Sequence, residues 1–598
     1  MGEVGVPPAA EGPARLRGDG RYVRTALLAA ILILASLVRF WGLPFGLPHT
    51  ETRPDESVIV GLAEQFWSGD LNPRFFRYPT LQMYLTAVAF GADYAQGRWR
   101  GDYASPSDFR EAMIEDPPRF HLIGRVLTAL FGILTVIVVY RLAGAALGRD
   151  TGLVAAFFLS LTYLHVRDSH FATTDVPLTF FLTLSVWFVW RSYVRGRAAD
   201  HALAGVAAGL AMATKYLGLL VAFPLLAAHL LRPRPAGRSA ITPSELRKVL
   251  LFGACLVLAF LAATPFALPE WRMLVRDLHT DWDYARRGYW MVFGRAWSLH
   301  PRLSLWYGMG PPQLVAGAVG LGLFAVRRPR EAMVVLTLPL AYAVLTARDR
   351  LVFVRYAIPL VPFLCMGAAL VVTSLADRIA HNWPRSRATA LLALGALAIV
   401  SPSASSVWKL DRLLAHADTR VLIRGWIEAH IAPSQGLYQS ADRWSSVQLP
   451  LSPEAIFSRY AGKENGERRR VLLRQAAGRG GPGYDDWSWD GARFKRNGEP
   501  TTDLPGFILV PRSPLVAYSG VPEDLVALLA ARYTPTRSFV FNVWDPRQVF
   551  DQQDAFYLPL GGLEGIERPG PNFQLYALRP SPAPPAASTT SPAASGTR

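Results

Sequence analysis

Eleven predominantly apolar stretches, separated by polar connections, constrain this chain more than any other feature. A membrane-spanning helix needs about 20 apolar residues, and fewer where neighbouring helices thin the bilayer. Of the 598 residues, 51% are hydrophobic and only 18% are charged, which is too apolar for a soluble protein of this size. The sequence therefore predicts a polytopic α-helical membrane protein with about 11 transmembrane helices. The predicted spans are residues 25–46, 122–142, 152–164, 176–190, 202–213, 217–231, 249–268, 303–326, 332–345, 356–375 and 388–400.

The net charge of +17 comes from arginines that cluster in the connections on one side of these spans. Such an excess is typical of cytoplasmic loops that face anionic lipid. We therefore expect the N-terminus in the cytoplasm and the C-terminal segment on the outer side. No basic stripe or reader motif points to a nucleic-acid partner. The basic connections include residues 141–149, 191–197, 232–248, 327–330 and 378–387.

Two segments decide this orientation. Residues 78–90 are apolar but end at Asp93, so we interpret them as a helix that lies in the membrane interface. Residues 202–231 are too long for one ordinary span and have basic flanks on both sides. A hairpin of two short helices would return both flanks to the cytoplasm and place Lys215 at the outer surface.

The composition divides the chain into four parts. Residues 1–24 are rich in Pro, Gly and Ala, and residues 580–598 in Pro, Ala, Ser and Thr, so both are predicted to be disordered tails. Soluble sequence after the last span predicts an α/β domain on the outer side, with a helix over residues 407–431 and strands near 507–510, 539–543 and 573–578. The predicted domains are a cytoplasmic tail 1–24, a transmembrane catalytic domain 25–403 with outer loops 47–120 and 269–302, an outer α/β domain 404–579 and a tail 580–598.

With this topology, the unusual polar residues fall on one side of the membrane. Arg53, Asp55 and Glu56 follow the first span, and His170 and Asp175 lie between two later spans. Lys215 tips the hairpin, and Arg355 and Tyr356 precede another span. These positions predict an outward-facing polar cavity that contains both acids and cations.

Each of these residues also has a purely structural interpretation. Asp55 and Asp175 stand at predicted helix starts, where an aspartate commonly caps the helix. Lys215 could extend from a short helix toward water, and Arg355 could be an interface anchor. Unpaired histidines such as His49 and His170 are more often hydrogen-bonding residues than metal ligands, so the metal is left open, with a divalent cation as one option.

The motifs, taken in order, resemble the polyprenyl-phosphate-sugar-dependent glycosyltransferases of the GT-C fold. The similar group is family 39, which includes protein O-mannosyltransferases, lipid A aminoarabinose transferases and bacterial relatives. The likeness covers about residues 25 to 375. The residues that carry it are Pro54-Asp55-Glu56, Tyr78-Pro79-Thr80-Leu81, Arg125, His170-Phe171-Ala172-Thr173-Thr174-Asp175-Val176-Pro177, Ala213-Thr214-Lys215-Tyr216 and Arg355-Tyr356-Ala357-Ile358-Pro359-Leu360-Val361-Pro362.

The resemblance implies transfer of a sugar from a polyprenyl-phosphate donor to an acceptor hydroxyl on the outer face. It assigns the role of general base, or of acceptor positioning, to Asp55, and a role in organising the acceptor or a cation to Asp175. A carboxylate beside a second one, close to low-dielectric lipid, takes up a proton more readily, which favours Asp55 as the base. Cationic side chains would stabilise the departing phosphate. The expected site residues are Asp55, Glu56 and Asp175 for catalysis, Lys215, Arg355, Tyr356 and Arg125 for the donor phosphate, and Arg53, His170 and Tyr78 for the acceptor or other contacts.

A single in-line displacement would invert the anomeric centre, so the sequence predicts an inverting glycosyltransferase. The main alternative is a transporter or flippase of lipid-linked sugars, which would place ionisable groups in mid-membrane and show repeated halves. The expected partners are the polyprenyl-phosphate-linked sugar, membrane lipid and an acceptor glycan, lipid or protein. The residue usage indicates a bacterial inner membrane, with a periplasmic C-terminus and active site.

Overall fold

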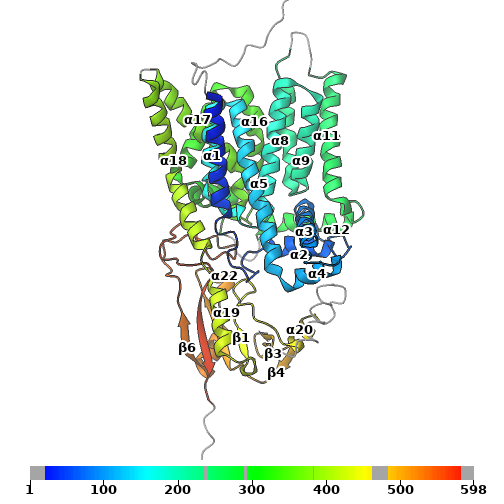
Figure 1. Ribbon diagram of the computed structural model, residues 1–598, viewed down its shortest axis with the longest axis vertical. Helices are drawn as coiled ribbons and strands as arrows, with labels where there is room; N and C mark the ends of the chain where they lie inside the picture. The colour runs from blue at the N-terminus through cyan, green and yellow to red at the C-terminus, as the bar shows by residue number, and fades with distance from the viewer. Residues whose placement is uncertain (1–19, 235–239, 289–292, 382, 461–482, 581–598) are drawn as a thin grey trace, which may run out of the picture.

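The computed structural model describes residues 20–234, 240–288, 293–381, 383–460 and 483–580. A bundle of long apolar helices forms one end of the molecule, and a domain with two small sheets forms the other (Figure 1). The first helix, α1, begins at Gly20, so residues 20–24 of the expected tail are helical. Residues 1–19 and 581–598, where we predict disorder, lie outside the described residues.

Each of the eleven predicted spans coincides with helical structure. The longest, α5 and α18, have 30 residues each, whereas α6 has only 12. The corresponding helices are α1 (Gly20–Phe40), α5 (Pro117–Ala146), α6 (Arg149–Ser160), α8 (Asp175–Arg195), α9 (Ala198–Met212), α10 (Ala222–Leu231), α11 (Pro243–Ala263), α15 (Pro311–Arg327), α16 (Pro329–Thr346), α17 (Val361–Ala380) and α18 (Arg385–Leu414).

Fewer than eleven of these helices are long and apolar enough to be identified as membrane spans from length and composition alone. Among the described residues, five helices are long and apolar enough to cross a bilayer, or up to six if one bent pair is a single span. The bent pair replaces the straight span expected at 303–326, because the chain bends by 115° between Ala296–Met309 and Pro311–Arg327. Gly310, at φ 79°, ends the first part in the left-handed region, and Pro311 starts the second. The count of eleven crossings stays a prediction.

The hairpin predicted around Lys215 is present in the structure. α9 ends at Met212, and a 3-10 helix, η1 (Tyr216–Val221), leads into α10. Arg232, just after α10, donates a hydrogen bond to the carbonyl oxygen of Arg195 before α9, at 3.4 Å. The two flanks of the hairpin therefore lie together, and Lys215 lies at its turn.

Basic connections gather at the end of the bundle that is opposite the sheet domain. Arg24 pairs with Asp150 at 3.0 Å, and Arg328 donates to the carbonyl oxygen of Ala146 at 3.1 Å. The helices of the predicted outer loops lie instead between the bundle and the sheet domain (Figure 1). They are α2 (Glu56–Phe66), α3 (Leu81–Arg100), α4 (Pro106–Glu115) and α12 (Trp271–Arg287).

The last third of the chain forms the predicted α/β domain. Its main sheet has the order β1-β5-β7-β6, in which β1 and β5 are parallel and the other pairs antiparallel. The helix α19 (Thr419–His430) contributes Ile423 and Ile427 to the core beneath this sheet. The remaining elements are β1 (Leu437–Gln439), α20 (Pro453–Tyr460), β2 (Trp487–Trp489), β3 (Phe494–Arg496), β4 (Glu499–Thr501), β5 (Phe507–Arg512), α22 (Val516–Ser519), α23 (Glu523–Arg532), β6 (Tyr533–Phe539) and β7 (Asn572–Leu578).

Two boundaries differ from the sequence-based expectation. The helix predicted over residues 407–431 is two helices, because α18 continues from the membrane to Leu414 and α19 starts anew after Asp418. The Asp418 carboxylate accepts a hydrogen bond from the Arg420 amide, which caps α19. The boundary expected at residues 403/404 therefore falls inside α18. The strand expected at 539–543 ends at Phe539.

The segment between β6 and β7, residues 540–571, leaves the sheet and enters the helical domain. Phe556, Leu558 and Leu560 are part of the same buried cluster as the membrane helices. The Tyr163 hydroxyl, from the short helix α7 (Tyr163–Ser169), donates to the carbonyl oxygen of Pro559 at 3.2 Å. This insertion makes the two domains share one core, and it carries polar residues to the site described next.

Candidate active site

Asp55 does not cap the helix that follows it. It occupies the N-cap position of α2, yet its side chain makes no capping hydrogen bond. Its backbone has φ 73°, a left-handed conformation that non-glycine residues rarely adopt and that tends to mark functional sites. The carboxylate instead accepts a hydrogen bond from Arg355 at 2.7 Å. The alternative that Asp55 is only a helix cap is therefore wrong.

Asp175 and Lys215 form a second ion pair close by. Asp175 begins α8 without capping it, and its Oδ1 atom accepts a hydrogen bond from Lys215 Nζ at 2.5 Å. The ammonium group also lies 4.6 Å from the centre of the Tyr356 ring. An ammonium group has three donors, so Lys215 keeps hydrogen-bonding capacity beyond this pair. The turn of the hairpin thus brings a cation to the acidic start of α8.

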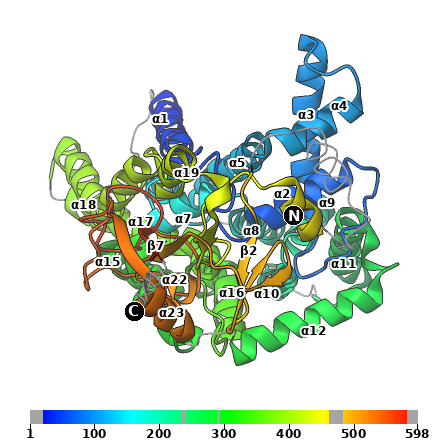
Figure 2. The same cartoon turned by 90° about the horizontal axis from the view of Figure 1, so that it is seen from below.

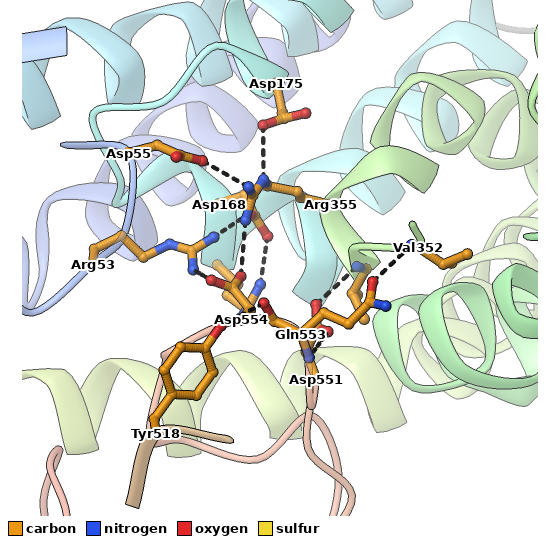
Figure 3. A network of polar contacts seen from close by, with 12 residues as sticks. Arg53, Asp55, Asp168, Asp175, Val352, Arg355, Tyr518, Asp551, Gln553 and Asp554 are labelled. Carbon is orange, nitrogen blue, oxygen red and sulfur yellow. Dashed lines mark hydrogen bonds and ion pairs between the residues drawn. The ribbon is translucent and has the colours of Figure 1, made fainter. Parts of the chain in front are cut away.

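Arg355 lies at the centre of the site and contacts three carboxylates (Figure 3). Its guanidinium is 2.7 Å from Asp55, 3.4 Å from Asp175 and 3.0 Å from Asp554. The contacts come from three distant stretches of the chain, and the arginine side chain is almost fully buried. A buried guanidinium needs such partners, because an uncompensated charge would be costly. Arg355 therefore organises the acids rather than anchoring a helix at the interface.

The C-terminal domain supplies polar residues that sequence reasoning missed. In Figure 3, Asp551, Gln553 and Asp554 approach the segment around Arg355 from the side of that domain. The backbone amide of Val352 donates to Gln553 Oε1 at 2.8 Å, and that of Val354 donates to Asp551 Oδ2 at 2.9 Å. The signal in the sequence is the run Asp551-Gln552-Gln553-Asp554 within an otherwise apolar stretch. Buried polar residues of this kind need partners, and here the partners lie in the membrane domain.

Arg53 connects Asp554 to a second buried group. Its guanidinium pairs with Asp554, and it lies 4.4 Å from the centre of the Phe171 ring. The Arg53 guanidinium also lies 3.9 Å from the carboxylate of Asp168. That carboxylate accepts a hydrogen bond from Arg167 at 2.9 Å. Arg53 was expected to make acceptor or other contacts. The structure places it fully buried beneath the site, where it supports the network instead.

Tyr78 and Tyr356 supply the phenol groups of the site. Burial raises the pKa of the Tyr78 hydroxyl well above its ordinary value, and the charge of Asp55 raises it further. The hydroxyl therefore stays protonated near neutral pH and can donate a hydrogen bond. The Tyr356 ring packs edge-to-face against Phe353, and its face lies under the Lys215 ammonium group, so it helps to fix the position of that group.

Glu56 and Arg125 lie apart from this constellation. Arg125 donates to both oxygens of Glu56, at 3.0 and 2.8 Å, and to the backbone carbonyls of Leu43 and Phe45. A further bond to Thr52 uses the fifth N–H group, so this guanidinium has no donor left for a phosphate. Glu56 also accepts a bond from the Ala172 amide and is fully buried. Both residues were expected in the chemistry, but the structure uses them to join α2, α5 and the loop before α8.

His170 is likewise a structural residue. One ring nitrogen faces the carbonyl oxygen of Val166 and the other that of Trp41, each at 3.0 Å. Within the ranges that the structure describes, no group of three or more His, Cys, Asp and Glu side chains is arranged to hold a metal ion. Asp55, Asp175 and Asp554 all pair with Arg355, and Asp175 and Asp554 pair in addition with Lys215 and Arg53.

Exposure distinguishes the acids of the site from one another. The side chain of Asp55 is 26% exposed, whereas those of Asp175 and Asp554 are 4% and 1% exposed. A group that receives a proton from a substrate must be reachable by it. Asp55 is therefore the carboxylate best placed to react, and the buried acids hold the cations in position.

Comparison with known proteins places the chain in a recognised fold. Residues 122–267 match the family described as dolichyl-phosphate-mannose-protein mannosyltransferase. An uncharacterised protein of Aquifex aeolicus (strain VF5) is 28% identical over 149 residues. That alignment covers 22% of this chain and 30% of the relative, so the similarity in sequence is confined to part of each protein.

The solved structure of ArnT from Cupriavidus metallidurans bound to undecaprenyl phosphate matches with a TM-score of 0.50 at 15% identity. The match covers 90% of this chain and 98% of that one. The oligosaccharyltransferase AglB from Archaeoglobus fulgidus has a TM-score of 0.47 at 13% identity, over 69% of this chain and 59% of that one. The similarity to ArnT over nearly the whole chain confirms the multi-pass helical membrane architecture and the GT-C fold. The predicted resemblance to this group of glycosyltransferases is confirmed as well.

Proposed function

We propose that this protein is a glycosyltransferase that moves a sugar from a polyprenyl-phosphate donor to an acceptor hydroxyl. The reaction would occur at the membrane surface that faces the C-terminal domain. The observation that carries the proposal is the ion pair between Asp55, a partly exposed carboxylate, and Arg355, the central buried cation. A base and a cation side by side are what such a displacement needs, because one group loses a proton while another gains negative charge.

In this proposal, Asp55 accepts the proton of the acceptor hydroxyl as its oxygen attacks the anomeric carbon. The bond from that carbon to the phosphate oxygen breaks in the same step, and the lipid phosphate leaves with the bonding electrons. A single in-line displacement inverts the anomeric centre. The attacking oxygen becomes the new glycosidic oxygen, and Asp55 ends the step protonated.

Lys215 and Arg355 would bind the departing phosphate. Among the described residues, Lys215 pairs with one carboxylate, that of Asp175. Each of the three guanidinium nitrogens of Arg355 pairs with one carboxylate oxygen. Each therefore retains N–H groups that can turn toward a phosphate oxygen. Tyr78, with its protonated hydroxyl, is placed to donate a hydrogen bond to the donor or acceptor.

The same arrangement supports an enzyme over the alternative of a transporter or flippase. Transporters place ionisable groups near the middle of the membrane, between repeated halves. Here the acids and cations lie where helices α2 and α8 begin, next to the C-terminal domain. We propose a bacterial inner membrane as the location, with the N-terminus in the cytoplasm and this site on the periplasmic side.

The test is to incubate the purified full chain with a panel of undecaprenyl-phosphate-linked sugars and a membrane extract that contains acceptors. Release of undecaprenyl phosphate and a new glycoconjugate, both measured by mass spectrometry, are the expected results. Analysis of the α and β anomers of the product reports on inversion. Transport of intact donor across sealed vesicles, without release of the lipid phosphate, would overturn the proposal in favour of a flippase.

A further inference from the structure

A second cationic site lies outside the constellation around Arg355. A cavity of about 830 Å³ opens where the ends of α12 and α16 meet, and four of its seven lining residues are arginines. None of the residues proposed for sugar transfer lines this cavity. The lining residues are Trp282, Arg286, Arg295, Val344, Leu345, Arg348 and Arg350.

Backbone hydrogen bonds hold the walls of the cavity together. The Arg350 amide donates to the carbonyl oxygen of Ala285 in α12 at 2.7 Å. The amide of Ala296 donates to the carbonyl oxygen of Asp349 at 2.9 Å. The segment that follows α16 is therefore fixed to α12 on one side and to the start of α13 (Ala296–Leu299) on the other. Viewed from below, α12 and α16 lie next to each other (Figure 2).

The charge of the cavity is only partly compensated. Arg286 lies 3.6 Å from Asp349 and 4.5 Å from the centre of the Trp282 ring. Among the described residues, no carboxylate oxygen lies within 4.0 Å, the limit for an ion pair, of the guanidinium nitrogens of Arg295, Arg348 or Arg350. Arginines that converge without carboxylate partners repel one another, so an anion is needed to stabilise them.

The position of the cavity indicates what kind of anion it takes. Val344 and Leu345 are exposed apolar residues in the last turn of α16, where a predicted span reaches the membrane surface. On the predicted topology, the apolar wall of the cavity lies at the depth of the lipid chains and the cationic wall at the depth of the head groups. On the positive-inside rule, arginines are disfavoured on the outer side of the membrane, so four together there call for a specific ligand.

We propose that this cavity binds the phosphate group of an anionic phospholipid at the membrane surface. Guanidinium groups bind phosphate oxygens in pairs of parallel hydrogen bonds, and Val344 and Leu345 contact the adjoining acyl chain. The site would fix the depth of the α12 and α16 ends in the bilayer. This inference does not depend on the proposed sugar transfer, because it concerns binding alone.

The test uses the full chain in nanodiscs of phosphatidylcholine with and without phosphatidylglycerol. After extraction, native mass spectrometry counts the lipids that stay bound. We expect preferential retention of phosphatidylglycerol, and a loss of preference of about tenfold or more in the variant Arg295→Gln/Arg348→Gln/Arg350→Gln. The matched control is Arg287→Gln, an exposed arginine of α12 that pairs with Asp283 and does not line the cavity.

Equal retention of both lipids by the unmodified chain, or an unchanged preference in the triple variant, would overturn the proposal. Complete displacement of the lipid by millimolar inorganic phosphate would assign the cavity to free phosphate instead. If the triple variant fails to fold, the single variants Arg295→Gln and Arg348→Gln decide the question in the same assay, each against Arg287→Gln.

Discussion

Arg355 donates a hydrogen bond to Asp554 at 3.0 Å, across 199 positions of sequence and across the boundary between the two domains. The arginine precedes a membrane helix, whereas the aspartate lies in the segment between the last two strands of the C-terminal domain. The same segment also binds the backbone just before Arg355, because Gln553 and Asp551 accept hydrogen bonds from the amides of Val352 and Val354. The C-terminal domain therefore positions the central cation of the candidate active site.

Asp554→Asn should impair both stability and turnover. The substitution leaves the buried guanidiniums of Arg53 and Arg355 short of one negative charge, and breaking a buried pair typically costs about 3–5 kcal/mol. We expect a lower thermal midpoint in detergent and slower release of lipid phosphate from the donor. A variant as stable and as active as the unmodified chain would show that the domains are joined by their apolar contacts alone.

Asp551→Asn should instead raise the stability of the protein, and the size of the gain should depend on pH. Burial, together with the charge of Asp554, raises the pKa of the Asp551 carboxyl to about 6. Since a raised pKa in the folded state favours the protonated acid, its contribution to stability is complete below about pH 4 and is lost as the pH rises through about 6. Asparagine mimics the protonated form. Thermal midpoints measured from pH 4 to 8 should therefore converge at low pH and favour Asp551→Asn at high pH.

Asp55→Asn should abolish most of the activity without unfolding the protein. Asparagine tolerates the left-handed backbone at this position and can still accept a hydrogen bond from Arg355, but it is not a base at neutral pH. Loss of a general base lowers turnover by about 10²–10⁴-fold. The measurement is initial rate of lipid-phosphate release at saturating donor, with Asp490→Asn on the C-terminal domain as control. An Asp55→Asn enzyme with full rate would remove this residue from the role of base.

Lys215→Gln should weaken stabilisation of the leaving phosphate. The ammonium group is held by Asp175 and Tyr356, so its removal leaves a neutral side chain of similar length in the same place. We expect kcat to fall by about 10²–10³-fold, the range for loss of one electrostatic contact in a transition state. Lys409→Gln, which removes an exposed lysine paired with Glu564, is the matched control. If only KM changes, Lys215 binds the donor in the ground state and takes no part in the displacement.

Glu56→Gln should act on folding rather than on the reaction. The side chain accepts two bonds from Arg125 and one from the Ala172 amide, all within the protein interior. An amide cannot accept both bonds from the guanidinium, so Arg125 loses part of its compensation, at a cost of about 3 kcal/mol. We expect a lower yield and thermal midpoint, while the rate per folded molecule falls far less than in Asp55→Asn. A rate loss equal to that of Asp55→Asn, with an unchanged midpoint, would restore Glu56 to the chemistry.

The chain's periodicity and charge determined its architecture in advance. Apolar stretches of near-membrane length predicted helices at all eleven places, and arginine clusters predicted which connections lie together. The hairpin around Lys215 could be predicted as well, because a run of that length with basic flanks at both ends has to fold back. Such features depend on local composition, which the sequence displays directly.

The sequence could also select Asp55, Asp175, Lys215 and Arg355, since each is a charged residue near an end of an apolar run, on the side that the charge pattern predicts to be shared. It favoured Asp55 as the base, but it could not show that the neighbouring Glu56 stays out of the chemistry. The helix start at Glu56 turns that side chain inward to Arg125, while Asp55 faces Arg355. Adjacent residues can face opposite ways, and only the packed helices decide which way each one faces.

Asp554 could not be assigned at all from its surroundings in the chain. Its partners, Arg53 and Arg355, lie about 500 and 200 positions away, and nothing in a sequence records a contact between segments that folding alone brings together. The sequence by itself determined a membrane bundle with acids and cations at one end. The tertiary structure decided which acid stays exposed, which cations are already neutralised, and that a segment of the C-terminal domain completes the site, because burial and charge compensation are properties of the assembled core.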